Sequence, residues 1–118
     1  MRSMSFMLTT QQITERTKDV TRRLGWDKLK PGDRLYACEK CMGLKRGEKI
    51  KRLAVIEIVK VTQERLYLMA SNETYGAEEA AREGFPNMTG RDFVLMFCQS
   101  MDCHPKTIVN RIEFKYVD

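Results

Sequence analysis

The sequence contains no long apolar run, and this absence restricts the classes of protein to consider. No segment approaches the run of about 18 apolar residues that a membrane-spanning helix requires. The N-terminal residues MRSMSFMLTT also lack the apolar stretch of about 7 to 15 residues that is typical of a signal peptide. We therefore expect a cytoplasmic protein with no membrane partner.

Internal repeats and low-complexity segments are absent as well, so no pattern divides the chain into several units. Its 118 residues, 42% of them hydrophobic, suffice for one domain (residues 1–118) whose core needs neither disulfides nor a metal. The four cysteines of such a cytoplasmic protein are expected to be thiols or metal ligands before they are disulfides.

Acidic residues are scarce in one part of the chain. Residues 11–52 contain 13 Lys and Arg but only 6 Asp and Glu, a net charge of +7, whereas residues 53–118 have a net charge of −3. A one-sided basic region attracts phosphates and is typical of nucleic-acid-binding proteins. It is equally compatible with a solvated loop whose lysines keep the protein soluble.

The patterns that are present alternate between strand and helix. The β-branched run LAVIEIVKV (53–61) predicts a central strand. The terminal TIVNRIEFKYV alternates apolar and polar residues, which predicts a half-buried strand with Ile108, Ile112 and Phe114 on the buried side. Shorter strands are expected at SFML, DVTRR and RLYACEK, a helical turn at GWDKL, and a turn at KPGD.

Helices are expected in three places. One begins at Thr9 or Thr10, and a second covers residues 74–85 with a stop at Gly84. The third, within MTGRDFVLMFCQSM, presents a core-facing stripe of Phe93, Met96, Phe97 and Met101. The resulting fold class is α+β, a small curved sheet or barrel with peripheral helices.

Several short motifs in this order resemble an ASCH domain. They are K-x-x-T-x-R (Lys18, Thr21, Arg23), the PGD turn (31–33), the helix end AREGF (81–85) and the strand RIEF (111–114). The resemblance covers nearly the whole chain and implies a PUA-like β-barrel or strongly curved mixed sheet. The usual ASCH signature is G-x-K-x-x-E-x-R; here Arg16 replaces the glycine and Thr21 replaces the glutamate.

One ASCH branch carries Lys and Thr at this spacing, with a Glu near a later helix end, and removes the acetyl group from N4-acetylcytidine. The resemblance implies Thr21 as nucleophile, Lys18 as base and Glu83 as acid/base. A threonine hydroxyl needs such a base, and a lysine serves as one when desolvation lowers its pKa. The alternatives are an ordinary strand threonine beside solvated basic residues, or a Lys18 and Arg23 that only bind.

The geometry of a strand constrains this site. Residues 18 and 21 of a regular strand point to opposite faces, whereas Thr21 and Arg23 share a face. We expect Lys18 in the loop before the strand, Thr21 and Arg23 facing a cleft, and Arg22 facing away.

The cysteines form a second candidate constellation. Cys38 and Cys41 have the C-x-x-C spacing of zinc ligands, and Cys98, Cys103 and His104 lie in a later segment. A single C-x-x-C is often incidental, so free thiols and no cofactor are expected. Zinc held by Cys38, Cys41, Cys103 and His104 is the alternative.

Two functions remain from the sequence. The first is an RNA-binding module with a nucleobase-sized cleft; its candidate contacts are Arg22, Arg23, Trp26, Lys45, Arg46 and Lys49. Trp26, Tyr36 and Phe85 are candidates for base stacking or for ordinary packing. The second is the amidohydrolase, acting on a modified nucleoside. The oligomeric state stays open.

Overall fold

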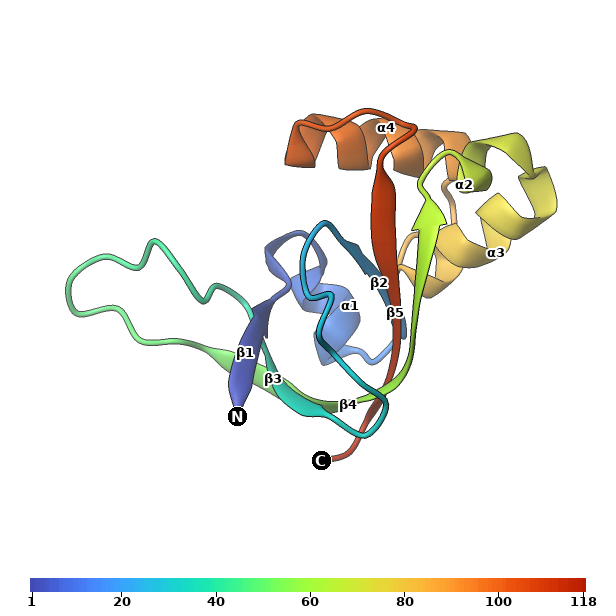
Figure 1. Cartoon of the computed structure of the whole chain (residues 1–118). Coiled ribbons are helices and arrows are strands. Elements are labelled where there is room, and N and C mark those ends of the chain that lie inside the picture. Colours follow the sequence, from blue (N-terminus) through green and yellow to red (C-terminus); the bar gives the residue numbers. More distant parts are fainter.

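A five-stranded sheet, curled into an open half-barrel, forms the centre of the computed structural model, which describes all 118 residues (Figure 1). The strand order is β1-β3-β4-β5-β2; β1 and β3 are parallel and the other neighbours antiparallel. The strands are β1 (Arg2–Ser5), β2 (Val20–Arg23), β3 (Arg34–Cys38), β4 (Arg52–Arg65) and β5 (Ile108–Tyr116). The predicted α+β class with a curved sheet is therefore confirmed.

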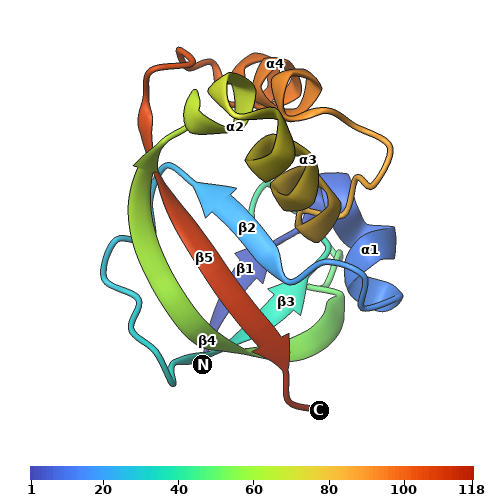
Figure 2. The same ribbon diagram turned by 90° about the vertical axis from the view of Figure 1, so that its right-hand side faces the viewer.

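Strand β4 gives the sheet its curvature. It continues beyond the predicted 53–61 segment, pairs with β3 along its first part and with β5 along the rest. A register shift between Ile58 and Lys60 lies where it passes from one partner to the other, and Figure 2 shows the strand as a long arc. The KPGD turn comes back to this point, since Gly32 N–H donates to the Ile58 carbonyl (2.8 Å).

Four α-helices and one 3-10 helix accompany the sheet. The 3-10 helix η1 (Met7–Thr9) leads into α1 (Thr10–Thr14), and three helices separate β4 from β5: α2 (Leu68–Ser71), α3 (Glu73–Arg82) and α4 (Gly90–Met101). The short α2 was not expected from the sequence. None of these helices has the length and apolar character needed to cross a membrane.

Glycines allow α2, α3 and α4 to approach closely. A Cβ on Gly76 of α3 would lie 2.0 Å from the Met69 carbonyl oxygen and 2.9 Å from the Cα of Gly90. The contact therefore leaves no room for any side chain at Gly76. Helix α3 starts at the Asn72 cap, whose side chain accepts from Tyr75 N–H, and the chain turns away at Gly84 with φ +104°.

Two apolar clusters lie on opposite sides of the sheet. The first, inside the half-barrel, contains Met4, Phe6, Ile13, Leu29, Leu35, Ala37, Ala54, Ile56, Ile58, Ile112 and Phe114. The second, under α2–α4, contains Leu66, Met69, Ala80, Phe93, Val94, Phe97 and Val109. Strand β5 contributes to both clusters, so both of its faces are partly covered.

Two details of the predicted apolar faces are wrong. Ile108 is 53% exposed, because it lies at the start of β5, while its neighbour Val109 is buried against the helices. Met101 is 44% exposed because it is the last residue of α4, where the helix extends past the segments that it packs against (Figure 1). Phe93 and Phe97 are buried in the predicted stripe, and Met96 packs at its margin.

Candidate functional site

The segment before β2 is held between β5 and α3. Phe114 N–H donates to the Asp19 carbonyl, the Tyr116 hydroxyl donates to the Lys18 carbonyl (2.6 Å), and Asp19 N–H donates to the Arg82 carbonyl. Val20 then begins the strand. Lys18 thus lies in the approach to β2, from which its side chain reaches the C-terminal end of α3.

Lys18 forms a buried ion pair with Glu83. Its Nζ lies 2.6 Å from Glu83 Oε1 and also donates to the Glu83 carbonyl at 2.8 Å, and both side chains are 3% exposed. Burial lowers the pKa of the Lys18 ammonium, although the charge of Glu83 and its hydrogen bond oppose this shift. Lys18 therefore loses its proton more readily than a surface lysine.

Thr21 and Arg23 point to the same face of β2, opposite to the face from which Arg22 projects. Arg23 Nε donates to Thr21 Oγ1 (3.1 Å) and Arg23 Nη2 donates to the Ser5 carbonyl of β1 (2.7 Å). The guanidinium also lies 4.7 Å from the centre of the Phe6 ring. Arg23 therefore links β2 to β1, the two edge strands of the half-barrel.

Arg23 has no carboxylate partner. Desolvation lowers the pKa of its guanidinium to about 10, despite the opposing charge of Glu83. The structure thus joins Lys18 to Glu83 and Thr21 to Arg23, and no hydrogen bond connects Thr21 to Lys18 or Glu83. Thr21 is 4% exposed, and its hydroxyl accepts from Arg23 but donates to no acceptor.

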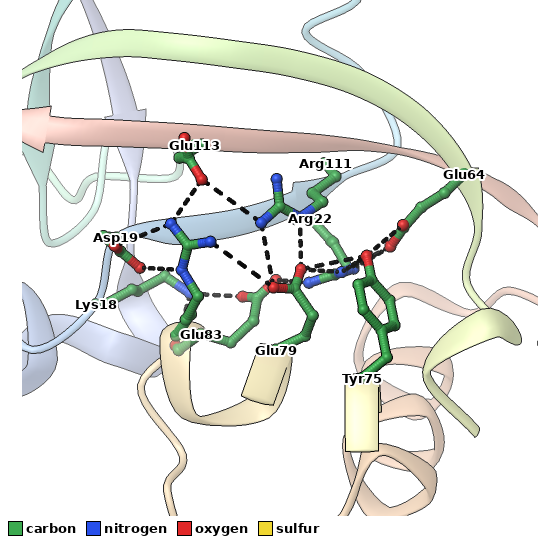
Figure 3. A network of polar contacts seen from close by, with 10 residues as sticks. Lys18, Asp19, Arg22, Glu64, Tyr75, Glu79, Glu83, Arg111 and Glu113 are labelled. Atoms are coloured by element: carbon green, nitrogen blue, oxygen red, sulfur yellow. Dashed lines mark hydrogen bonds and ion pairs between the residues drawn. The ribbon is translucent and has the colours of Figure 1, made fainter. Parts of the chain in front are cut away.

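Arg22 points in the opposite direction, toward α3, and is buried. Its guanidinium contacts Glu64 at 2.6 Å, Glu79 at 2.6 Å and Glu83 at 3.0 Å (Figure 3). Burial opposes its charge, but these carboxylates outweigh that effect and raise the pKa of Arg22. No part of Arg22 is free to contact a phosphate, so the expectation that it binds RNA does not fit its position.

Arg22 belongs to a larger layer of charges between the sheet and α3, which we call the charge layer. Its cations are Lys18, Arg22, Arg82 and Arg111, and its carboxylates are those of Asp19, Glu64, Glu79, Glu83 and Glu113 (Figure 3). The Tyr75 hydroxyl donates to Glu64 at 2.6 Å. No buried polar side-chain atom lacks a partner.

Glu79 lies at the centre of the charge layer. Burial opposes its ionisation, but hydrogen bonds from Arg111 and Arg22 and their charges lower its pKa to about 2. Sequence reasoning missed this role. A signal existed, because Glu79 and Glu83 are four residues apart on one face of the predicted helix, while Arg111 and Glu113 alternate on the polar face of the last strand.

The basic loop between β3 and β4 remains exposed. Lys45, Arg46 and Lys49 point into solvent, and Glu39 with Lys51 (3.7 Å) is the one ion pair among residues 39–51. At the base of this loop lies a hollow of about 280 Å³; its walls are Met7, Glu39, Lys40, Leu44, Glu48, Lys49 and Lys51. Neither this hollow nor the other main one, beside Arg65, is lined by Lys18, Thr21 or Glu83.

The aromatic candidates differ in their surroundings. Trp26, at φ 67°, is partly exposed, and the Arg2 guanidinium lies over its ring, 5.0 Å from the ring centre. The Arg52 guanidinium lies over the Tyr36 ring, 3.8 Å from its centre. Phe85 packs beside Phe93 (6.2 Å) in the second cluster, which identifies it as a packing residue.

The cysteines do not form a metal centre. Cys38 is the last residue of β3 and Cys41 lies in the loop that follows, while the sulfurs of Cys98 and Cys103 lie 3.9 Å apart at the end of α4. No group of three or more possible ligands is brought together. The zinc alternative fails on geometry, because Cys38, Cys41, Cys103 and His104 do not meet.

Comparison with known proteins supports the fold. No family model and no curated protein matches the sequence. Two crystal structures are similar. A protein of family DUF984 from Enterococcus faecalis has 14% identity and a TM-score of 0.62, covering 99% of this chain and 80% of that one. An ASCH domain from Lactobacillus crispatus has 15% identity and a TM-score of 0.57, covering 98% and 78%. The chain therefore has an ASCH-like fold, as the resemblance implied.

Proposed function

We propose that this protein binds single-stranded RNA through the surface of residues 39–52. The observation that carries the proposal is the exposed, unbalanced charge of this segment. It contains six Lys and Arg against two Glu, a net charge of +4, and its single ion pair leaves most of the cations available. RNA phosphates are the natural partners of such a surface.

The hollow at the base of the loop gives this surface a place for one nucleotide. Its volume of about 280 Å³ is close to the lower end of the range for ligand pockets, and its walls combine Met7 and Leu44 with three lysines and two glutamates. Apolar side chains can contact a base while the lysines contact its phosphate. Tyr36, whose ring lies under Arg52 of this segment, offers a surface for stacking once Arg52 turns toward a phosphate.

The salt dependence of RNA binding tests this function. If about four phosphates are neutralised, the logarithm of the affinity falls with the logarithm of the salt concentration with a slope of about −3. The double variant Lys45→Glu, Arg46→Glu is expected to weaken binding by more than about tenfold at low salt. A matched control, Lys60→Glu, Arg91→Glu, makes the same change in net charge at exposed sites outside the loop.

Fluorescence anisotropy with a labelled single-stranded RNA measures both quantities. Binding that is unaffected by salt, or that falls equally in the loop variant and in its control, contradicts the proposal.

A second candidate function is hydrolysis of an acetylated nucleoside, and the buried Lys18–Glu83 pair favours it. The lowered pKa makes the neutral amine of Lys18 easier to reach, and this neutral amine can accept the Thr21 proton, for which no acceptor is present in the free protein. Thr21 Oγ then attacks the acetyl carbonyl carbon, the C–N bond breaks, and the leaving amine takes the proton. Water hydrolyses the resulting ester with Glu83 as base, which releases acetate.

This chemistry requires a movement of Lys18 toward Thr21, and it is tested with N4-acetylcytidine. Released cytidine is quantified for the native protein and for Thr21→Ala, Thr21→Ser and the control Thr14→Ala, which changes an exposed threonine of α1. We expect turnover to vanish in Thr21→Ala and to persist in part in Thr21→Ser. Turnover that survives Thr21→Ala excludes this mechanism.

A further inference from the structure

We propose that a second site, at the C-terminal end of β4, binds a nucleotide, either a free nucleoside monophosphate or one unit of a single-stranded RNA. The site is a hollow of about 530 Å³ lined by Arg65, Tyr67, Leu68, Ser71 and Lys106. It lies at the opposite end of β4 from the basic loop (Figure 1). It therefore differs from the surface that carries the proposed function.

The charge of this hollow fits a phosphate. Arg65 and Lys106 are its two cations, and no carboxylate lines it. Neither belongs to any of the ion pairs, in contrast to Arg22, Arg82 and Arg111 of the charge layer. Arg65 Nη1 donates to the Lys106 carbonyl (3.2 Å), which holds the guanidinium over the hollow and leaves its other N–H groups for a ligand.

The apolar part of the hollow fits a base. Tyr67 is 51% exposed and Leu68 is 41% exposed, although both lie in a region where their neighbours Leu66 and Met69 are fully buried. The Tyr67 hydroxyl takes part in no hydrogen bond and its ring in no aromatic pair. An exposed ring in a hollow that is also lined by two cations provides a stacking surface together with phosphate donors.

The hollow is also preformed. Leu66 N–H donates to the Thr107 carbonyl (3.0 Å), and Leu66 anchors the segment in the second apolar cluster. On the other side, the turn that carries Lys106 is closed by Thr107 N–H donating to the His104 carbonyl (2.9 Å) and by Lys106 N–H donating to His104 Nδ1 (3.1 Å). Little backbone ordering is therefore required when a ligand binds.

Binding of adenosine monophosphate tests this site. Amide chemical shifts of labelled protein are followed during titration with adenosine monophosphate, adenosine and inorganic phosphate. We expect shifts confined to residues 65–71 and 104–107, with the monophosphate binding more tightly than either part. Tyr67→Ala and Arg65→Gln are each expected to weaken it by about tenfold, whereas Arg91→Gln, an exposed cation of α4, is the unaffected control.

Two results overturn the inference. The first is the absence of chemical-shift changes at these residues. The second is an affinity for the monophosphate that equals the affinity for inorganic phosphate and is unchanged in Tyr67→Ala. A single-stranded RNA distinguishes the two ligand sources. Weaker RNA binding by Arg65→Gln assigns the site to the polymer, and RNA binding unchanged beside weaker monophosphate binding assigns it to the free nucleotide.

The loop variant Lys45→Glu, Arg46→Glu separates this inference from the proposed function. Loss of RNA binding in that variant, without monophosphate binding at the hollow, overturns the second site alone. Monophosphate binding at the hollow, together with salt-independent RNA binding, overturns the function of the loop alone.

Discussion

The charge layer and the loop of residues 39–51 are both rich in charged side chains, and they use them in opposite ways. The charge layer has four cations and five carboxylates, contributed by the segment before β2 and by β2, β4, β5 and α3. The ion pairs of Lys18, Arg22 and Arg111 are shielded from water, whereas the pair of Arg82 with Asp19 lies at the exposed edge of the layer. The loop has an excess of cations, all contributed by one local segment, with a single ion pair.

This difference shows that the charge of a segment does not give the charge that a ligand meets. Lys18 and Arg22 belong to the basic stretch 11–52, but Glu83, Glu79 and Glu64 of the acidic half neutralise them. Removing these two cations from the count lowers the available excess of the stretch from +7 to +5. Most of what remains lies on the loop, which is why the proposed RNA surface is placed there.

The largest effect is expected from breaking the charge layer at Arg22. Arg22→Leu removes the cation shared by Glu64, Glu79 and Glu83, so that Lys18 and Arg111 remain as partners of Glu83 and Glu79 while Glu64 loses its only ion pair. The free energy of unfolding should fall by about 3–5 kcal/mol. Urea denaturation followed by circular dichroism measures this loss, and a variant as stable as the native protein would show that the layer contributes nothing.

The second effect is a pH dependence centred on Glu79. The pKa of Glu79 in the folded protein, about 2, is below its ordinary value of 4.5. The contribution of ionised Glu79 to the free energy of unfolding is therefore fully present above pH 4.5 and is lost as the pH falls toward 2. The loss amounts to about 3 kcal/mol. Denaturation midpoints measured between these pH values should fall steeply in the native protein and less in Glu79→Gln, and parallel slopes would contradict this assignment.

A smaller effect is expected at an exposed ion pair. Arg34 and Glu57 pair at 3.1 Å on adjacent strands, but the Arg34 side chain is 56% exposed. Arg34→Leu should therefore change the free energy of unfolding by less than about 1 kcal/mol. A comparison with Arg22→Leu under the same conditions attributes the difference in the free energy of unfolding to burial of the ion pair. Similar losses of unfolding free energy in both variants would refute that explanation.

The smallest effect on stability is expected in the loop. Lys45→Glu with Arg46→Glu changes four units of charge, yet both side chains are exposed and take part in no ion pair. The unfolding free energy should stay within about 0.5 kcal/mol of the native value, while RNA affinity falls. A large drop in thermal stability would mean that the loop cations stabilise the fold and would remove the contrast with the charge layer.

Much of the fold follows from local sequence. The β-branched run of β4, the alternation of β5, the turn at Gly32 and the helix stop at Gly84 are each determined by neighbouring residues, and they lie where the sequence predicts them. The short α2 carries no comparable local signal. Its position depends on the close contact of the Met69 carbonyl with Gly76 of α3 and Gly90 of α4, and Gly90 lies 21 residues further along the chain.

The arrangement of the candidate site belongs to the tertiary structure. The sequence by itself determined that Thr21 and Arg23 lie on the same face of the strand, because side chains alternate between the two faces with a period of two. It could not determine that Arg22, on the other face, meets three carboxylates, since Glu64, Glu79 and Glu83 come from a strand and a helix brought over β2 only by folding. Local periodicity fixes the direction of a side chain, whereas its burial and its ionic partners depend on which distant element covers that face.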